Sequence, residues 1–319
     1  MAHQHTSDEH TPHGHPPDEH APHHHHDDVD VDWAVLGPHL EAGAELQLPV
    51  LTQAATRLRD LQGERRVSRI LDVGSGPGVM ACVLAATFPD AEVVAVDGAP
   101  ELLERTVARA ERLGLTGRVR THHAPMPEGL RDTVLPPADL VWTSKTVHHL
   151  GDQQAALDAL VGLLRPGGVL AVVEDGLPMR FLPRDIGMGR PGLQARLDAV
   201  HEEWFERMRA SLPGAVDVVE DWPRMLAAAG LVDVAARSFL LDVPPPAPDA
   251  ARAFLHSTLL RYVEHLGEAL QPGDQEVLAV LVDPDDERSV LRRADVFVRS
   301  AITMVTGRRP SVPAEAVTR

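Results

Sequence analysis

The stretch 72–97, DVGSGPGVMACVLAATFPDAEVVAVD, holds three glycines within five positions, an aspartate just before them and another aspartate at its far end. Glycines in a turn between a strand and a helix let the backbone approach a ligand closely, and the first amides of the helix can bind it. Dinucleotide-binding chains space these glycines as G-x-G-x-x-G and place a pyrophosphate there. This chain has G-x-G-x-G and so departs from that pattern.

The two aspartates narrow the chemistry of the ligand. Asp72 stands two residues before Gly74, where its carboxylate would repel a pyrophosphate and attract an ammonium group. Asp97 closes the next predicted strand, where a carboxylate can accept hydrogen bonds from both hydroxyls of a ribose. Alternatively, Asp97 caps the helix that starts near Pro100. An amine partner, a ribose partner and a glycine turn together describe a nucleoside joined to an amino acid.

Strands and helices are predicted to alternate around this stretch. Apolar, mostly β-branched segments predict strands at 69–74, 92–97, 118–123, 138–144 and 168–175, separated by helices at 78–87, 100–113 and 152–164. Later segments predict a long helix at 193–212, a helix that stops at Gly230 and a sixth strand within 221–243, and a final strand at 295–307. This rhythm indicates an α/β fold with a doubly wound parallel sheet covered on both faces.

The pattern divides the chain into six parts. They are a His-rich tail (1–28), an N-terminal helical segment (29–66), the nucleotide-binding core (67–175), a helical cap insertion (176–220), the C-terminal part of the sheet with a helical insertion (221–310) and a tail (311–319). The inserted helices are expected to cap the carboxyl edge of the sheet, where ligands bind in folds of this kind.

The first 28 residues contain ten of the eighteen histidines in a near-duplicated repeat. Such a polar, Pro-rich segment buries too little apolar surface to order itself, so disorder is expected. Its imidazoles either capture Zn²⁺ or Ni²⁺ weakly or belong to a solvated tail. Both interpretations stay open, and no metal site is predicted in the core.

Composition excludes several classes of protein. The formal charge is −17 and no basic stripe is present, which argues against nucleic acid as the main partner. No apolar run is long enough for a membrane span and no secretion signal is visible, so a cytoplasmic enzyme is expected. Cys82 is the only cysteine, which excludes an internal disulfide; its apolar neighbours predict a buried core position.

Four segments in order resemble the class I S-adenosylmethionine-dependent methyltransferases. LDVGSGPG (71–78) and VVAVDGAPELLERTVARA (93–110) resemble the first two motifs of that family. ADLVWTSKTVHHL (138–150) and LLRPGG (163–168) resemble its fourth-strand segment and the turn before its fifth strand. The resemblance covers about 68–175 and implies a Rossmann-like seven-stranded sheet whose last strand is antiparallel. It also implies S-adenosylmethionine as cofactor and S-adenosylhomocysteine as product.

The resemblance also implies a set of cofactor-binding residues. Asp72 would lie near the methionine amino group, and Asp97 would hold the ribose. The family usually places an acidic residue after the third strand to contact adenine, but Ala124 stands near that point here. Met126 would pack against the adenine ring or against the core. The full predicted set is Asp72, Gly74, Ser75, Gly76, Gly78, Asp97, Gly98, Ala124, Met126 and Thr143.

Two residues after the fourth strand are candidates for catalysis, His148 and Lys145. If this loop turns into a short helix, their spacing puts them on one face. An imidazole titrates near neutrality and suits a general base, although a histidine pair here is common in the resembled family and can simply pack around the cofactor. Lys145 would hold an acceptor carboxylate or be solvated.

Other candidates were weaker on sequence grounds. His149 is a less favoured base than its neighbour. Glu174 and Asp175 end the fifth strand, where they would bind acceptor hydroxyls, cap a helix or be solvated. Trp204, Phe205 and Met208 have helical spacing, which favours a core role.

We therefore predict a methyltransferase that acts on a small organic acceptor, with oxygen favoured over nitrogen or carbon as the target atom. The alternatives are methylation of a peptide or protein side chain, and a non-catalytic nucleoside-sensing or metal-handling protein on the same fold. No Asn-Pro-Pro-aromatic motif follows the fourth strand and no Pro-Cys pair exists, which excludes the usual DNA methylation chemistries. No nucleic-acid or membrane partner is expected, and a homodimer is one open oligomeric state.

Overall fold

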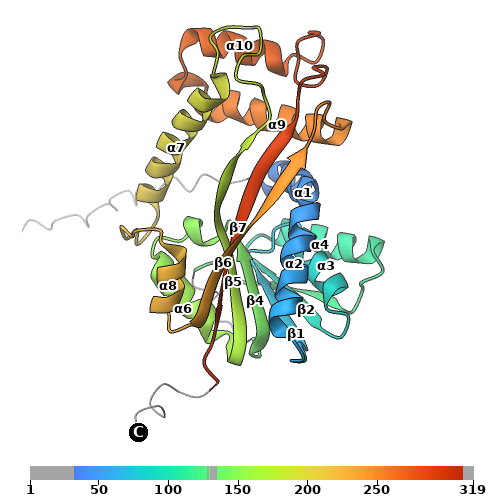
Figure 1. Cartoon of the computed structure of the whole chain (residues 1–319), viewed down its shortest axis with the longest axis vertical. Coiled ribbons are helices and arrows are strands. Elements are labelled where there is room, and N and C mark those ends of the chain that lie inside the picture. Colours follow the sequence, from blue (N-terminus) through green and yellow to red (C-terminus); the bar gives the residue numbers. More distant parts are fainter. Residues whose placement is uncertain (1–31, 128, 130–134, 312–319) are drawn as a thin grey trace, which may run out of the picture. The chain divides into compact units, whose positions relative to one another are not determined.

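The computed structural model describes residues 32–127, 129 and 135–311 (Figure 1). The predicted His-rich tail lies outside these residues, so its metal binding stays a prediction. The helices are α1 (Trp33–Leu46), α2 (Leu48–Gln62), α3 (Val79–Thr87), α4 (Pro100–Arg112), α6 (Gln153–Gly162), α7 (Leu193–Ser211), α8 (Trp222–Ala228), α9 (Asp249–Leu266) and α10 (Pro272–Val282), with short 3₁₀ turns η1 (Val147–His149) and η2 (Gly267–Ala269). The strands are β1 (Arg69–Val73), β2 (Glu92–Asp97), β3 (Val119–His123), β4 (Ala138–Ser144), β5 (Leu164–Arg180), β6 (Val232–Val243) and β7 (Val298–Arg308).

The seven strands form one sheet in the order β3-β2-β1-β4-β5-β7-β6. The first five run parallel, whereas β7 runs antiparallel to both of its neighbours. The chain builds outward from β1 to β3 and then returns to place β4 beside β1. Parallel doubly wound sheets bind ligands outside the strand ends where the order reverses, so this topology places a site after β1 and β4. The predicted fold class is confirmed.

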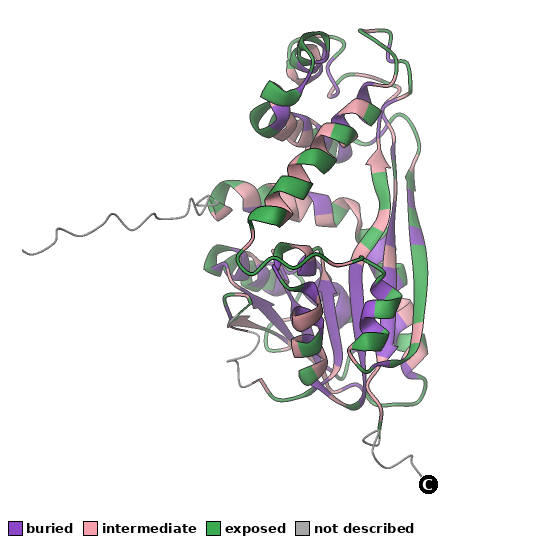
Figure 2. Ribbon diagram, turned by 90° about the vertical axis from the view of Figure 1, so that its left-hand side faces the viewer, coloured by how far each residue is buried: buried purple, intermediate pink, exposed green. Residues whose placement is uncertain are grey.

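Alternate residues of the parallel strands bury themselves on opposite faces of the sheet. On β1, Ile70 belongs to the apolar cluster shared with α2 and α3, and Leu71 belongs to the cluster shared with α6 and α8. The central strands β1, β2 and β4 are buried along nearly their whole length (Figure 2). Cys82 of α3 is buried in the first cluster, as predicted. Helices on both faces explain why these strands are apolar throughout rather than alternating.

The last strands depart from the sequence prediction in length. β5 was expected over 168–175 but runs from Leu164 to Arg180, so the segment RPGG lies inside the strand. The extension exists because β5 pairs with β4 from Leu164 and continues along the antiparallel β7 as far as Arg180 opposite Arg299. Figure 1 shows α7, α9 and α10 beyond the carboxyl ends of the parallel strands, where the cap was expected.

One further local prediction, the stop of a helix at Gly230, is confirmed by the structure. Gly230 has φ +84° just after α8, which is the predicted helix stop. In the described part of the chain, no helix is both long and apolar enough to cross a membrane.

Candidate active site

The glycine turn after β1 contains three glycines with left-handed backbone conformations, and their surroundings differ. A Cβ on Gly74 would lie 2.0 Å from the Thr146 Oγ1, and a Cβ on Gly78 would lie 2.5 Å from the Thr106 Oγ1. Nothing lies within 4 Å of a Cβ placed on Gly76. The first and last glycines therefore allow close packing within the protein, and the middle one faces open space that a ligand could fill.

Asp97 ties this turn to the neighbouring strand β2. Its Oδ2 accepts the Gly76 N–H at 2.8 Å and its Oδ1 accepts the Ala99 N–H at 3.0 Å. Ala99 is the residue before α4, so the capping role considered for Asp97 is present. Burial raises the pKa of Asp97, and hydrogen bonds from backbone amides oppose that shift. The side chain thus holds the glycine turn in place whatever else it binds.

Asp72 lies beneath the same turn and is only 2% exposed. Burial and the nearby Asp97 together raise the pKa of its carboxyl to about 7, against the opposing effect of a hydrogen bond from the Ala81 backbone at the start of α3. Its Oδ2 has no hydrogen-bond partner among the described residues. A buried carboxylate with an unused oxygen is costly alone and is stabilised by a cation.

Two buried hydroxyls stand at the same strand ends. Ser75 lies within the glycine turn, and Thr143 lies opposite Val73 where β4 pairs with β1. Neither hydroxyl has a hydrogen-bond partner in the part of the chain that the structure describes. Buried hydroxyl groups usually have a hydrogen-bond partner, so the edge where β1 and β4 end has hydrogen-bonding groups available for a ligand.

The other predicted cofactor residues lie at the end of β3. Ala124 is buried and donates its N–H to the Asp97 carbonyl at 2.9 Å, and His123 Nε2 lies 3.0 Å from the Gly98 carbonyl. Met126 is half-buried against the second apolar cluster, so its core contact is present. These residues are drawn together beside Asp97.

The loop after β4 is organised by a residue of β5. Glu174 has a fully buried side chain, whose Oε2 lies 2.6 Å from His148 Nδ1. Its Oε1 accepts the backbone N–H groups of Thr146 and Val147 at 2.7 and 2.8 Å. One carboxylate therefore caps the 3₁₀ turn η1 and fixes the ring of His148. Since Thr146 also packs on Gly74, this loop sits directly against the glycine turn.

Lys145 does not share a helical face with His148, because the short helix on which that expectation depended does not include Lys145. Lys145 has φ +52° and precedes the 3₁₀ turn, which begins only at Val147. Lys145, with its left-handed backbone, turns the chain before the 3₁₀ turn begins. The three-residue spacing between Lys145 and His148 therefore does not place them on one helical face. The Lys145 side chain is exposed to solvent, yet enough protein surrounds its ammonium group that burial lowers its pKa, while Glu174 raises it.

His149 lies beside His148, with their Nε2 atoms 3.0 Å apart. Burial, together with the adjacent His148, lowers the pKa of His149 to about 4. The His149 ring is therefore neutral at physiological pH, and one of the two Nε2 atoms carries the shared proton.

Helix α7 contacts this loop from the cap. The Phe205 ring meets the His148 ring edge-on, with centroids 5.4 Å apart. The Arg209 guanidinium donates to the carbonyls of His148 and Leu150, both at 2.7 Å. Trp204, Phe205 and Met208 were expected in the core but are only half-buried, and Phe205 lies against the candidate site.

Comparison with known proteins identifies the family. The family described as "Methyltransferase domain" matches residues 71–170. The chain is 32% identical over 203 residues to a trans-aconitate 2-methyltransferase of Methylobacterium radiotolerans, covering 58% of this chain and 74% of that protein. It is 30% identical to a 27-O-demethylrifamycin SV methyltransferase of Amycolatopsis mediterranei, covering 67% and 74%. The chain belongs to the class I S-adenosylmethionine-dependent methyltransferases.

A third relative matches less of its length. A demethylmenaquinone methyltransferase of Thermus thermophilus is 36% identical over 121 residues, which is 37% of this chain and 52% of that protein.

The methyltransferase described here uses S-adenosylmethionine as its methyl donor. The residues present fit that group, because the unused oxygen of Asp72 matches an ammonium group and the open space over Gly76 leaves room for a nucleoside.

Sequence reasoning missed three residues of this methyltransferase site. Glu174 was weighed only as one of a pair, Thr146 was passed over, and Arg209 was not considered. The ends of adjacent parallel strands meet at one edge, so the acidic end of the fifth strand could have been matched to the histidines after the fourth. No sequence signal pointed to Arg209, because its partners are backbone carbonyls 58 to 61 residues away.

Proposed function

We propose that this methyltransferase transfers a methyl group to a small organic acceptor, with oxygen as the favoured target atom. The observation that carries the proposal is the 2.6 Å contact between His148 Nδ1 and the buried carboxylate of Glu174. An oxygen nucleophile usually needs a base, and an imidazole held by a carboxylate can act as one. The names of two relatives identify small acceptors, trans-aconitate and a rifamycin modified at an oxygen.

On the cofactor side, we assign the ammonium group to Asp72 and the ribose hydroxyls to Asp97. The remaining members of the cofactor set are Gly74, Ser75, Gly76, Gly78, Gly98, Ala124, Met126 and Thr143. When bound, S-adenosylmethionine supplies a methyl group on a positively charged sulfur. Transfer removes that charge, so the protein mainly has to align the acceptor and exclude water.

On the acceptor side, His148 takes the proton from the acceptor hydroxyl. The carboxylate of Glu174 accepts a hydrogen bond from the Nδ1–H group of His148, which leaves Nε2 of that ring as the unprotonated, basic nitrogen. In the structure, Nε2 of His149 lies next to Nε2 of His148. We therefore assign the acceptor hydroxyl to the position that the neutral His149 ring occupies, which that ring must leave when the acceptor binds. Lys145 is assigned to a polar group of the acceptor. The cap over 176–220 and the helical insertion within 221–310 would select the acceptor.

The test begins with the purified full chain and S-adenosylmethionine labelled in its methyl group, screened against a library of small hydroxyl, carboxyl and amine compounds. For the acceptor found, His148→Gln should lower kcat by about 100- to 10,000-fold, the usual contribution of a general base. The dissociation constant for S-adenosylhomocysteine should stay unchanged, as measured by calorimetry.

His265→Gln is the matched control, because His265 is exposed on α9 and lies beside Glu264 of the same helix. It should retain full activity. Full activity in the His148 variant would remove this residue from the reaction. Labelling of a protein side chain in place of any small compound would favour the alternative acceptor class.

A further inference from the structure

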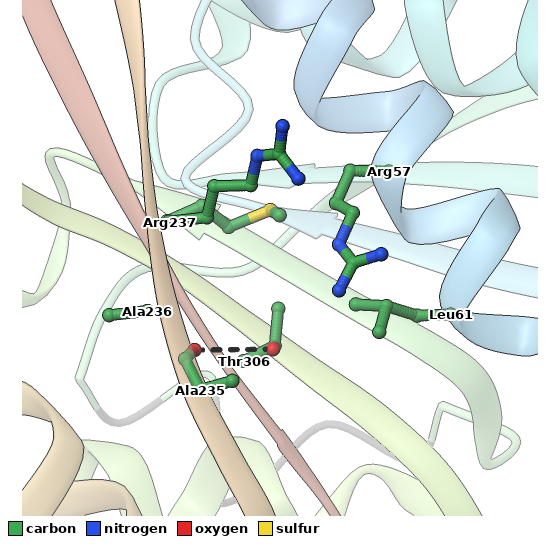
Figure 3. A pocket seen from close by; sticks show the side chains of 7 residues that line it. Arg57, Leu61, Ala235, Ala236, Arg237 and Thr306 are labelled. Carbon is green, nitrogen blue, oxygen red and sulfur yellow. Dashed lines mark hydrogen bonds between the residues drawn. The ribbon is translucent and has the colours of Figure 1, made fainter.

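A cavity lies away from the candidate active site. It has a volume of about 330 Å³ and lies between α2 and the last two strands (Figure 3). Thr306 on its wall pairs with Ala171 in the middle of β5, whereas the active site follows the strand ends. No lining residue belongs to the cofactor or catalytic sets.

Two arginines line this cavity from opposite elements. Arg57 comes from α2 and is half-buried, and Arg237 comes from β6 and is exposed. Figure 3 shows both side chains extending into the space between helix and strand. The Arg237 guanidinium lies 5.7 Å from the ring centre of Phe239, a contact that steadies it. Neither arginine forms a hydrogen bond or an ion pair within the described ranges.

Carboxylates are plentiful in this chain, yet none pairs with Arg57 or Arg237 within the described residues. The chain has 47 acidic and 30 basic residues, and elsewhere a single carboxylate, Glu41, pairs with Arg105, Arg109 and Arg112. Asp60 follows Arg57 by three residues on α2, close enough to pair with it, but the two do not form an ion pair. Two guanidinium groups at one cavity with no carboxylate partner therefore leave room for an external anion.

The surroundings add to the positive charge. Arg308 donates to the carbonyls of Leu61 and Gly167 at 2.9 and 2.7 Å, and Leu61 itself lines the cavity. Burial lowers the pKa of Arg308, the positive charge of Arg65 lowers it further, and Asp233 raises it. Arg308 and Arg65 thus lie near the C-terminal end of α2, beside the cavity.

The lining also indicates the chemistry of the rest of the ligand. Leu61, Met304 and two alanines of β6 offer apolar surface. Thr306 Oγ1 donates to the Ala235 carbonyl at 3.3 Å, so its lone pairs can still accept a hydrogen bond. Guanidinium groups bind carboxylate and phosphate with two parallel hydrogen bonds, and the volume is that of a small-molecule site.

We infer that this cavity, which we call the α2–β6 site, binds a small organic anion with a carboxylate or phosphate group on an apolar body. The site is separate from methyl transfer, so the anion is neither cofactor nor acceptor. Arg57 and Arg237 bind the acidic group, and Leu61 and Met304 contact the apolar part.

The test uses phenyl phosphate and benzoate as probes on the full chain saturated with S-adenosylhomocysteine, with binding measured by calorimetry at constant ionic strength. At least one probe should bind at millimolar concentration. Inorganic phosphate should bind more weakly and benzyl alcohol not at all. The stronger of the two acidic probes identifies the acidic group.

Arg57→Gln and Arg237→Gln should each weaken probe binding at least about tenfold, the loss of one charge-assisted hydrogen bond. Arg59→Gln is the matched control, because Arg59 is an exposed residue of α2 that does not line the cavity. All three variants should bind S-adenosylhomocysteine as the unmodified chain does. No probe binding, or equal binding by the control and both cavity variants, would overturn the inference.

Discussion

At the scale of single residues, Asp72 shows how burial prepares a charge for a ligand. Burial holds the pKa of its carboxyl at about 7 in the ligand-free protein. If the carboxylate binds an ammonium group, its ionised form is the one that binds. Binding of S-adenosylhomocysteine should then weaken below pH 7, approaching about tenfold per pH unit.

Calorimetry between pH 5.5 and 8.5 would measure this dependence. Asp72→Asn should abolish it and weaken binding by about 10- to 100-fold at pH 8, the scale of a lost charge-assisted hydrogen bond. A pH-independent affinity in the unmodified chain would show that Asp72 does not contact the amino group.

The same carboxyl of Asp72 should make the folded protein less stable as the pH rises, although it strengthens ligand binding over the same range. Its pKa is raised from 3.8 to about 7 on folding, so the folded protein keeps a proton that the unfolded chain releases above pH 4. Stability is therefore lost as the pH rises from about 4 to 7. In thermal denaturation without ligand, Asp72→Asn should raise the melting temperature at pH 7 more than at pH 4. Equal shifts at both pH values would contradict this account.

Glu174 is a positioning residue at this scale, acting through His148. In Glu174→Gln the side-chain oxygen can still accept the N–H groups of Thr146 and Val147, but the amide nitrogen cannot accept the Nδ1 proton of His148. We expect kcat to fall by about 100-fold or more with little change in KM or in the melting temperature. A parallel loss of stability and activity would indicate a merely structural role.

At the scale of elements, ion pairs join helix α1 to helix α4 of the nucleotide-binding core. Glu41 of α1 accepts hydrogen bonds from Arg105, Arg109 and Arg112, all on one side of α4. The side chain of Arg109 is only 9% exposed. Removing its partner leaves a buried cation partly unpaired, which is costly.

Glu41→Gln should therefore lower the free energy of unfolding by about 1 to 3 kcal/mol and speed amide exchange in α1. Glu45→Gln is the comparison, because Glu45 also pairs with Arg109 but is half-exposed. Its loss should cost about 1 kcal/mol or less. Equal effects of the two substitutions would mean that burial does not strengthen the Glu41 network.

At the scale of the whole molecule, the cap and the sheet meet at the catalytic loop. Arg209 of α7 binds the carbonyls of His148, Leu150 and Gly151, which form the loop after β4. The position of the base therefore depends on where α7 docks. A catalytic group moved by about 1 Å can lose about 100-fold in rate.

Arg209→Met keeps the length of the side chain and removes its donors. We expect kcat to fall by about 10- to 100-fold while the affinity for S-adenosylhomocysteine changes little. Arg207→Met, at an exposed position of the same helix, should leave kcat unchanged. An unaltered kcat in the Arg209 variant would show that the cap does not position the loop.

The sequence by itself determined most of the elements and the position of the glycine turn. Apolar spacing located the strands and helices within a few residues, and three glycines framed by Asp72 and Asp97 identified the turn. Both signals arise between near neighbours in the chain, because strand and helix periods and the backbone freedom of glycine are local properties.

Only the tertiary structure decided the catalytic half. Glu174 reaches His148 because β5 lies beside β4, and Arg209 reaches the same loop because α7 docks across it. Lys145 and His148 do not share a helical face, because Lys145 has a left-handed backbone and lies before the 3₁₀ turn. The α2–β6 cavity likewise joins residues about 180 to 250 positions apart. Such contacts depend on strand order and helix docking, which no local pattern encodes.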